Sequence, residues 1–186
     1  MTTPSTLILG VDPDTTRPGV AVWDTAERAF VSVGTMELRE LLAWARQGCP
    51  PGIALAVVED SRSLPIYDRH VRTATDMFNT LREKGFAVPP SLSKTLRYFA
   101  VQAVHVGEVK AVTTFIIDTL AEAGVEVRTQ APASGGKLDA DAFRQRTGWR
   151  GRTNGEARDA AMLVHDKWAG ELWRMKQARV QRGGAA

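Results

Sequence analysis

Hydrophobic positions in the first 60 residues fall into four short apolar runs. These runs predict strands at 7–11, 20–23, 29–34 and 53–58, and a helical pattern at 35–47 separates the last two. Three strands in direct succession favour antiparallel pairing. A buried strand that follows a helix favours a parallel position beside the first strand. This part of the chain therefore predicts a mixed sheet.

The rest of the chain is mostly helical in pattern. One helix is expected at 66–84, a second begins around 91–94, and a strongly apolar helix covers 106–124. Alternation at 125–129 predicts a fifth strand, followed by helices at 138–147 and at 156–175. The predicted fold class is α/β, with a mixed five-stranded sheet in which three antiparallel strands precede parallel ones, flanked by helices.

Nothing in the pattern divides the 186 residues into separate domains. We expect a single domain over 1–176 that carries a helical insertion at 61–104. The basic segment 177–186 is expected to be a disordered tail, as chain termini often are.

Composition narrows the class of protein. Cys49 is the only cysteine, which excludes an internal disulfide and a cysteine-based metal cluster. The N-terminus lacks the features of a signal peptide, and no apolar run approaches the ~20 residues that span a bilayer. A cytoplasmic protein without a membrane partner is expected. Ten basic residues against four acidic ones between 144 and 182 suit a polyanion, although a solvated helix face would look the same.

Four acidic residues stand at the ends of predicted elements. Asp12 ends the first strand, Glu59 ends the fourth, and Glu156 and Asp159 lie three residues apart on one face of the last helix. Four gathered carboxylates repel one another, so their convergence favours Mg²⁺ or Mn²⁺, which prefer oxygen ligands. Two such ions ~3.5–4 Å apart can activate a water and stabilise the leaving oxygen in phosphodiester hydrolysis.

Each acid also has a purely structural explanation when it is taken alone. Asp12 could cap the turn that follows it, and Glu59 could be a solvent-facing strand end. Glu156 and Asp159 are of the type that the helix dipole favours at an N-terminus. Only the conjunction of these positions favours a nuclease site.

Three segments carry a resemblance to a known family: ILGVDPDTTRPGVAVWD, VVEDSRS and RTNGEARDAAMLV. With them the chain resembles the RuvC-type Holliday junction resolvases of the ribonuclease H-like superfamily, closest to phage or distant bacterial members. Asp12 matches the first-strand catalytic aspartate, Glu59 the fourth-strand glutamate, and Asp159 the aspartate of the last helix. Glu156 stands where relatives carry Asp or His.

The resemblance implies a metal-dependent, structure-selective endonuclease that acts on branched DNA, above all on four-way Holliday junctions. It implies Asp12, Glu59, Glu156 and Asp159 as catalytic residues and metal ligands, with two Mg²⁺ or Mn²⁺ ions per active site. It also implies a homodimer that makes paired symmetric nicks and leaves 5′-phosphate and 3′-hydroxyl ends. In the family the dimer forms largely through the helix predicted here at 106–124.

Candidate DNA contacts are less specific. The family carries a base-contacting aromatic residue between the second acid and the long helix, and Tyr67 is the nearest candidate. Lys137, Arg150 and Arg152 are candidates for phosphate contacts, or are solvated loop charges. Asp14 departs from the glycine that relatives usually have after the first Asp-Pro.

Two other functions remain open. A junction-binding protein with little or no hydrolysis would share the fold and the basic residues. An actin-like ATPase or kinase-type phosphotransferase would share the strand-end aspartate and the Thr-rich turn. That class normally needs two large lobes and a more glycine-rich phosphate loop, which 186 residues of this composition do not supply.

Overall fold

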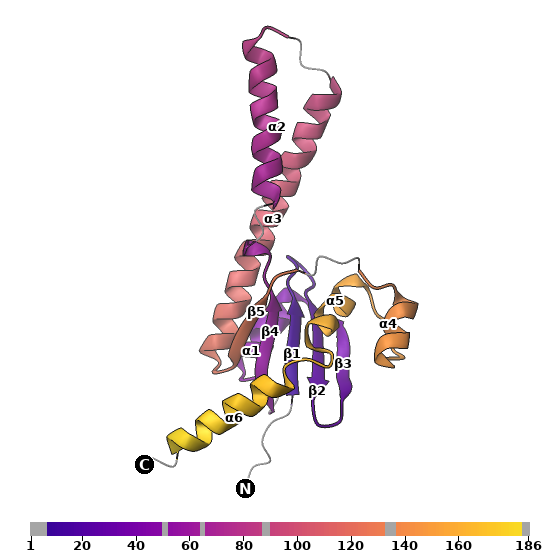
Figure 1. The fold of residues 1–186 in the computed structure, drawn as a ribbon, viewed down its shortest axis with the longest axis vertical. Helices are drawn as coiled ribbons and strands as arrows, with labels where there is room; N and C mark the ends of the chain where they lie inside the picture. Colours follow the sequence, from indigo (N-terminus) through magenta and orange to yellow (C-terminus); the bar gives the residue numbers. More distant parts are fainter. Residues whose placement is uncertain (1–6, 50–51, 64–65, 87–89, 133–136, 184–186) are drawn as a thin grey trace. The chain divides into compact units, whose positions relative to one another are not determined.

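The structure is a computed structural model that describes residues 7–49, 52–63, 66–86, 90–132 and 137–183, with part of the side chains between 63 and 102 (Figure 1). A five-stranded sheet in the order β3-β2-β1-β4-β5 forms its centre. Its strands are β1 (Leu7–Asp12), β2 (Gly19–Asp24), β3 (Ala29–Thr35), β4 (Ile53–Glu59) and β5 (Glu126–Gln130).

The pairing confirms the predicted fold class. β1 pairs antiparallel with β2, and β2 antiparallel with β3, whereas β4 is parallel to both β1 and β5. The sheet therefore has the predicted arrangement of three antiparallel strands followed by parallel ones. The register places Asp12 opposite Gly19, at the start of β2.

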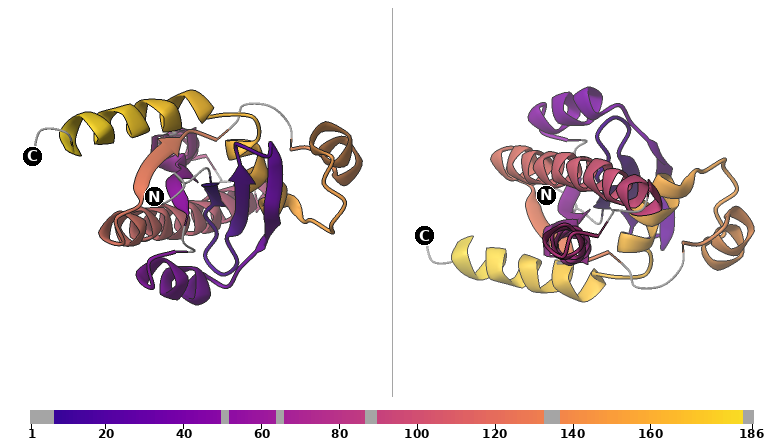
Figure 2. Two further views of the ribbon diagram at one scale, coloured as in Figure 1. Left: turned by 90° about the horizontal axis from the view of Figure 1, so that it is seen from below. Right: turned by 90° about the horizontal axis from the view of Figure 1, so that it is seen from above.

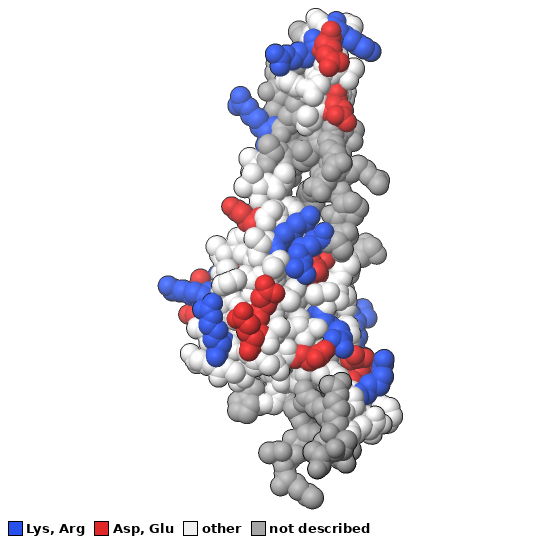
Figure 3. Space-filling model, turned by 90° about the vertical axis from the view of Figure 1, so that its left-hand side faces the viewer, with Lys and Arg blue, Asp and Glu red and all other residues white. Residues whose placement is uncertain are grey.

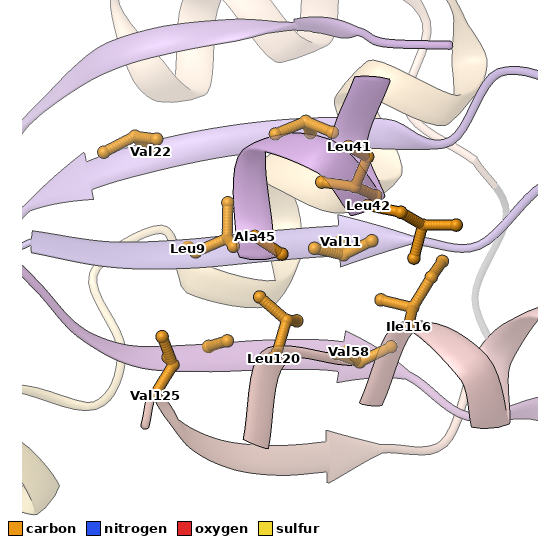
Figure 4. Close-up of a cluster of buried hydrophobic side chains, with 12 residues drawn as sticks. Leu9, Val11, Val22, Leu41, Leu42, Ala45, Val58, Ile116, Leu120 and Val125 are labelled. Atoms are coloured by element: carbon orange, nitrogen blue, oxygen red, sulfur yellow. The ribbon is translucent and has the colours of Figure 1, made fainter. Parts of the chain in front are cut away.

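One face of the sheet packs against α1 (Leu38–Arg46) and the last turns of α3 (Pro90–Glu122) (Figure 4). Successive side chains of a strand point to opposite faces, so the odd-numbered residues of β1 lie on this side. Its buried cluster consists of aliphatic side chains from both helices, from the sheet and from the turn before β5: Leu9, Val11, Val20, Val22, Leu41, Leu42, Ala45, Ala56, Val58, Ile116, Leu120 and Val125.

The other face packs against α5 (Gly155–Val164), with α4 (Ala140–Thr147) and α6 (Ala169–Gly183) beside it (Figure 2). Ile8 of β1 and Val57 of β4 are buried there against α5 and α6. Asp12 and Glu59 have the same parity as Ile8 and Val57, respectively. Alternation along the two strands therefore places both acids on the α5 side of the sheet.

The chain forms two compact units, one of residues 1–60 with 112–186 and the other of residues 61–111. The second unit contains a 3-10 turn (Ser61–Ser63), α2 (Ile66–Glu83) and the first part of α3. The two helical segments expected from residue 91 to residue 124 are one continuous 33-residue helix. Pro90 stands at its first position, where the helix makes no use of a backbone N–H. Gly107 in its interior lowers the stability of the helix by only ~1 kcal/mol relative to alanine.

The single helix expected at 156–175 is wrong, because the chain turns sharply after Val164. Asp166 and Trp168 both adopt positive φ, at 52° and 68°. The Trp168 indole N–H and the Lys167 ammonium donate to the carbonyls of Leu163 and Met162, at 2.9 and 2.7 Å. These bonds satisfy carbonyls that the last turn of α5 leaves open.

α6 then continues to Gly183, beyond the end of the ordered chain expected at residue 176. Residues 177–183 of the expected tail are therefore helical in the structure, and residues 184–186 lie outside its described part. None of the described helices is both long and apolar enough to cross a bilayer.

Candidate active site

Three of the four predicted acids meet at the carboxyl end of β1. Asp12, Glu156 and Asp159 each place an oxygen within 4.8 Å of the other two. Asp12 is buried, with 6% of its surface exposed, and the other two are partly exposed. Residues from two ends of the sequence therefore form one cluster of hard oxygen ligands.

Two glycines allow α5 to approach the sheet closely enough for this contact. A Cβ on Gly19 would lie 2.0 Å from the carbonyl oxygen of Glu156, and one on Gly10 would lie 2.2 Å from that of Ala160. Small residues on the facing side of α5, Ala157 and Ala160, complete the close packing. The distance between Asp12 and the α5 acids thus depends on the missing side chains at positions 10 and 19.

The first turn of α5 is fixed by a side-chain cap. Asn154 accepts a hydrogen bond from the Ala157 N–H at 2.9 Å, which satisfies one of the open donors of the helix start. Glu156 and Asp159 follow on one face, near the positive end of the helix dipole. Their carboxylates are stabilised there, and their position on the helix is set by its cap.

The turn after β1 is capped by Asp14 and not by Asp12. Asp14 Oδ1 accepts from the Thr16 N–H, the Thr16 hydroxyl and the Arg17 N–H, all at 2.8 Å. Capping of this turn, the purely structural explanation considered for Asp12, is therefore the role of Asp14. The same three bonds explain how the turn accommodates Asp14 at a position where relatives usually have glycine.

Glu59 lies at the end of β4 on the same side of the sheet, but it is outside the group of three. Its pKa is raised by burial and by the charge of Asp159, while Lys137 lowers it. Glu59 in turn makes the largest charge contribution to the shift of Asp12. The fourth acid is thus electrostatically part of the site without sharing the 4.8 Å cluster.

Burial and the neighbouring carboxylates raise the pKa of Asp12 to about 9. Burial is the largest cause, followed by the charge of Glu59 and a hydrogen bond with Glu156. A carboxyl group with this pKa holds its proton at neutral pH unless a cation neutralises its surroundings. The donor set therefore fits a hard divalent cation, which would replace that proton.

Lys137 is the cation that the fold brings to these acids. Its Nζ lies 2.5 Å from Asp159 Oδ2 and 3.7 Å from Glu156 Oε1. The pKa of Lys137 is raised by the hydrogen bond to Asp159. The predicted phosphate contact is therefore adjacent to the acids, where its single positive charge offsets part of the charge of two carboxylates.

Replacing Lys137 with glutamine is expected to lower the melting temperature of the metal-free protein and to raise its affinity for Mn²⁺ several-fold. The variant leaves Asp159 and Glu156 without their ammonium partner, which also competes with an incoming cation. Calorimetric titration with Mn²⁺ measures the affinity, and Lys84→Gln, at an exposed position of unit 61–111, is the control. Equal affinity in wild type and Lys137→Gln would contradict this role.

Arg158 was not predicted as a site residue, yet it holds the segment that carries Lys137. Its guanidinium donates to the carbonyls of Leu138 at 2.7 Å and Thr153 at 3.1 Å. Because Arg158 lies between the two acids of α5, these bonds tie the loop to the site. In the sequence Arg158 is one of several basic residues in a predicted helix, and no local pattern distinguishes it from the others.

Among the described residues, the ion pairs of Glu156 and Asp159 are made by Lys137 and not by Arg150 or Arg152. Arg150 and Arg152 lie exposed on the segment between α4 and α5. Tyr67 stands on α2, and its side chain is outside the described part of the structure. Trp149 of the same segment as Arg150 packs edge-on against Phe30, with ring centroids 6.3 Å apart.

No protein-family model and no curated protein sequence matches the chain. Among solved structures it is similar to RuvC of Thermus thermophilus in complex with a Holliday junction substrate, with 14% identity over 85% of this chain and 91% of that chain and a TM-score of 0.47. It is also similar to another Thermus thermophilus RuvC structure, with 14% identity over 84% and 92% and a TM-score of 0.43. These similarities concern the fold, and the roles of individual residues rest on the geometry of the site itself.

Proposed function

We propose that this protein is a metal-dependent endonuclease that cleaves branched DNA, with four-way Holliday junctions as its substrate. One observation carries the proposal. Oxygens of Asp12, Glu156 and Asp159 lie within 4.8 Å of one another at the carboxyl end of the central strand β1, and the pKa of Asp12 is raised to about 9. Such crowding of partly buried carboxylates has a chemical use when divalent cations neutralise it.

Asp12, Glu156 and Asp159 would hold Mg²⁺ or Mn²⁺, with Glu59 at the edge of the site, and two ions are proposed. When bound, these ions supply positive charge for the phosphate and lower the pKa of water. Lys137 would move from Asp159 to the phosphate, where its ammonium offsets the charge that develops during hydrolysis. Water adds to phosphorus as the bond to O3′ breaks, leaving a 5′-phosphate and a 3′-hydroxyl.

DNA affinity is proposed to come from particular cations and not from a uniformly basic surface. The face shown in Figure 3 carries Lys and Arg side chains beside Asp and Glu side chains. Arg150 and Arg152, both exposed, are proposed to contact the phosphates that flank the cleaved bond. Tyr67 is proposed as a base contact near the junction centre.

A labelled, immobile four-way junction beside a linear duplex of the same sequence tests the function. Symmetric cuts in the junction alone, with Mg²⁺ or Mn²⁺ and not with EDTA, are the expected result. Cuts confined to flaps or replication forks would support the nuclease activity but would change the proposed substrate. Binding without cutting in either metal would overturn the nuclease.

A junction-binding protein with little hydrolysis is the second candidate, and one observation favours it. Lys137 already pairs with Asp159 and Glu156, so a cation of the chain itself neutralises part of the cluster. Junction binding in EDTA followed by addition of metal separates the two, because only the nuclease then releases cut products. A phosphotransferase is disfavoured, since the described residues form one sheet and not two large lobes.

We further propose that two copies act together, because paired nicks need two sites related by a two-fold axis. Val101 and Val104, one helical turn apart on α3, expose 65% and 63% of their surfaces. Large exposed aliphatic side chains at this spacing favour a contact between helices.

Changing Val101 and Val104 together to aspartate is expected to convert a dimer into a monomer, because the charges would be buried in the contact. Sedimentation of the purified protein measures the mass. Val31→Asp is the control, since Val31 is equally exposed, at 60%, but lies on β3. An unchanged dimer mass in the double variant would place the interface elsewhere.

A further inference from the structure

A cavity of about 330 Å³ opens beside the acid cluster. Glu59, Asp159 and Lys137 line one part of it, and Arg146 and Lys167 line another. All of these residues belong to the unit of residues 1–60 and 112–186. The cavity is therefore continuous with the proposed active site but extends beyond it.

Arg146 and Lys167 are two like charges held close together. Burial lowers the pKa of Lys167, and the charge of Arg146 lowers it further. Burial lowers the pKa of His165, the C-cap of α5, and the charge of Arg146 lowers it further. In the described part of the chain neither Arg146 nor Lys167 pairs with a carboxylate.

Two neighbouring arginines, unlike Arg146 and Lys167, form ion pairs with carboxylates. Arg144, on the same helix as Arg146, pairs with Asp141 at 3.0 Å, and Arg28 pairs with Asp166 at 3.0 Å. The ammonium of Lys167 donates to one backbone carbonyl, that of Met162. Two repelling cations that form no ion pair among the described residues, at the wall of a cavity, offer a site for an anion.

Most of the remaining wall is apolar. Pro132, Leu138, Met162 and Leu163 contribute it, and Gln130 completes the lining. A volume of about 330 Å³ lies at the lower end of the ~300–1,000 Å³ typical of small-ligand pockets. The cavity therefore has room for one sugar and base beside a phosphate, and not for a longer stretch of strand.

We propose that this cavity binds the nucleotide next to the cleaved phosphate, with Arg146 and Lys167 on its phosphate and the apolar wall against its sugar and base. The proposal rests on the proposed function in taking the cleaved phosphate to the acid cluster. It names Arg146 and Lys167 as strand-positioning residues in addition to Arg150 and Arg152. A nucleotide held here would fix the strand in register with the acids.

The first test measures binding of a fluorescent dT15 oligonucleotide and of a four-way junction in EDTA, where no metal is bound. Arg146→Gln is expected to weaken both roughly tenfold at low salt, the size of one lost charged contact. It should also reduce the slope of log affinity against log salt by about 1. Arg144→Gln is the matched control on the same helix, and Lys167→Gln should repeat the effect of Arg146→Gln.

The second test reports on the cavity itself and does not depend on cleavage. Of the five methionines, Met162 lines the cavity, whereas Met36 packs on the opposite face of the sheet. With ¹³C-methyl methionine, dT15 should shift the Met162 signal and leave that of Met36 unchanged. At a dT15 concentration near the wild-type Kd, the shift should be several-fold smaller in Arg146→Gln and unchanged in Arg144→Gln.

The outcomes separate this proposal from the nuclease. If the Met162 shift depends on Arg146 but the protein cuts no junction, nucleotide binding in the cavity is supported and the proposed nuclease activity is overturned. An unmoved Met162 signal, or equal DNA affinity of Arg146→Gln and Arg144→Gln, would overturn the cavity whether or not the protein cuts DNA. A fall in the melting temperature of Arg146→Gln with unchanged DNA affinity would make its role structural and overturn the proposal.

Discussion

Asp12→Asn is expected to abolish junction cleavage and, at the same time, to make the metal-free protein more stable at pH 8. Loss of outer residues around a metal typically costs ~10–100-fold, so loss of a direct ligand should lower the cleavage rate at least about 100-fold. The gain in stability follows from the pKa of about 9 that Asp12 has in the fold.

The direction of the stability change can be derived from proton binding. Between its ordinary pKa of 3.8 and its pKa of about 9 in the fold, Asp12 holds a proton more often in the folded than in the unfolded chain. The free energy of unfolding therefore falls as pH rises through this window. Asparagine binds no proton, so the variant lacks this loss and should gain up to about 5 kcal/mol at pH 8. Near pH 3 the gain should vanish, because Asp12 is then protonated in both states.

Thermal unfolding in EDTA at pH 4, 6 and 8, with and without added Mg²⁺, checks the prediction beside the cleavage assay. Wild type should regain stability with Mg²⁺ at pH 8, whereas Asp12→Asn should not respond. Asp141→Asn, at an exposed position of α4, is the control and should show neither effect. Full cleavage by Asp12→Asn would show that the nuclease site is elsewhere.

Gly19→Ala is expected to separate the acids while the fold persists. The added Cβ would meet the carbonyl oxygen of Glu156 at 2.0 Å, and a backbone atom cannot rotate away as a side chain does. α5 must therefore move from β1, at a cost of about 1–3 kcal/mol in the free energy of unfolding. Because the carboxylates of Glu156 and Asp159 move with it, Mn²⁺ affinity and cleavage should fall about tenfold or more.

Gly34→Ala is the matched control for this prediction. Gly34 is also a strand glycine, opposite Val20 in the same sheet, and nothing lies within 4 Å of the position its Cβ would take. It should retain metal affinity and lose little stability. Circular dichroism, Mn²⁺ titration and the cleavage assay together compare the variants, with Gly10→Ala expected to resemble Gly19→Ala. Wild-type Mn²⁺ affinity in Gly19→Ala would mean that the position of α5 does not set the metal site.

The strands and the fold class followed from the sequence because their signal is local. Each of the five strands is a short apolar or alternating run, and three of them end at an acidic residue, Asp12, Asp24 or Glu59. The helices were less well defined at their ends. α3 is continuous because no interior residue forces a break, whereas α5 and α6 are separated by backbone turns at Asp166 and Trp168 that periodicity does not reveal.

Asp12, Glu156 and Asp159 could also be predicted as neighbours, since strand ends and a helix start fix their positions. Their separation could not, because it depends on α5 packing against the bare backbone of Gly10 and Gly19. Packing also placed Glu59 outside the 4.8 Å group.

The sequence by itself determined where the five strands lie, which acids stand at the ends of the first and fourth, and what chemistry four carboxylates favour. Only the tertiary structure decided which charges meet. Lys137 reaches Asp159 because Arg158 holds its loop, and Arg146 lies beside Lys167 because α4 packs near the end of α5. Periodicity is a property of neighbours along the chain, whereas these contacts join segments whose distance is set by close packing of side chains from several elements.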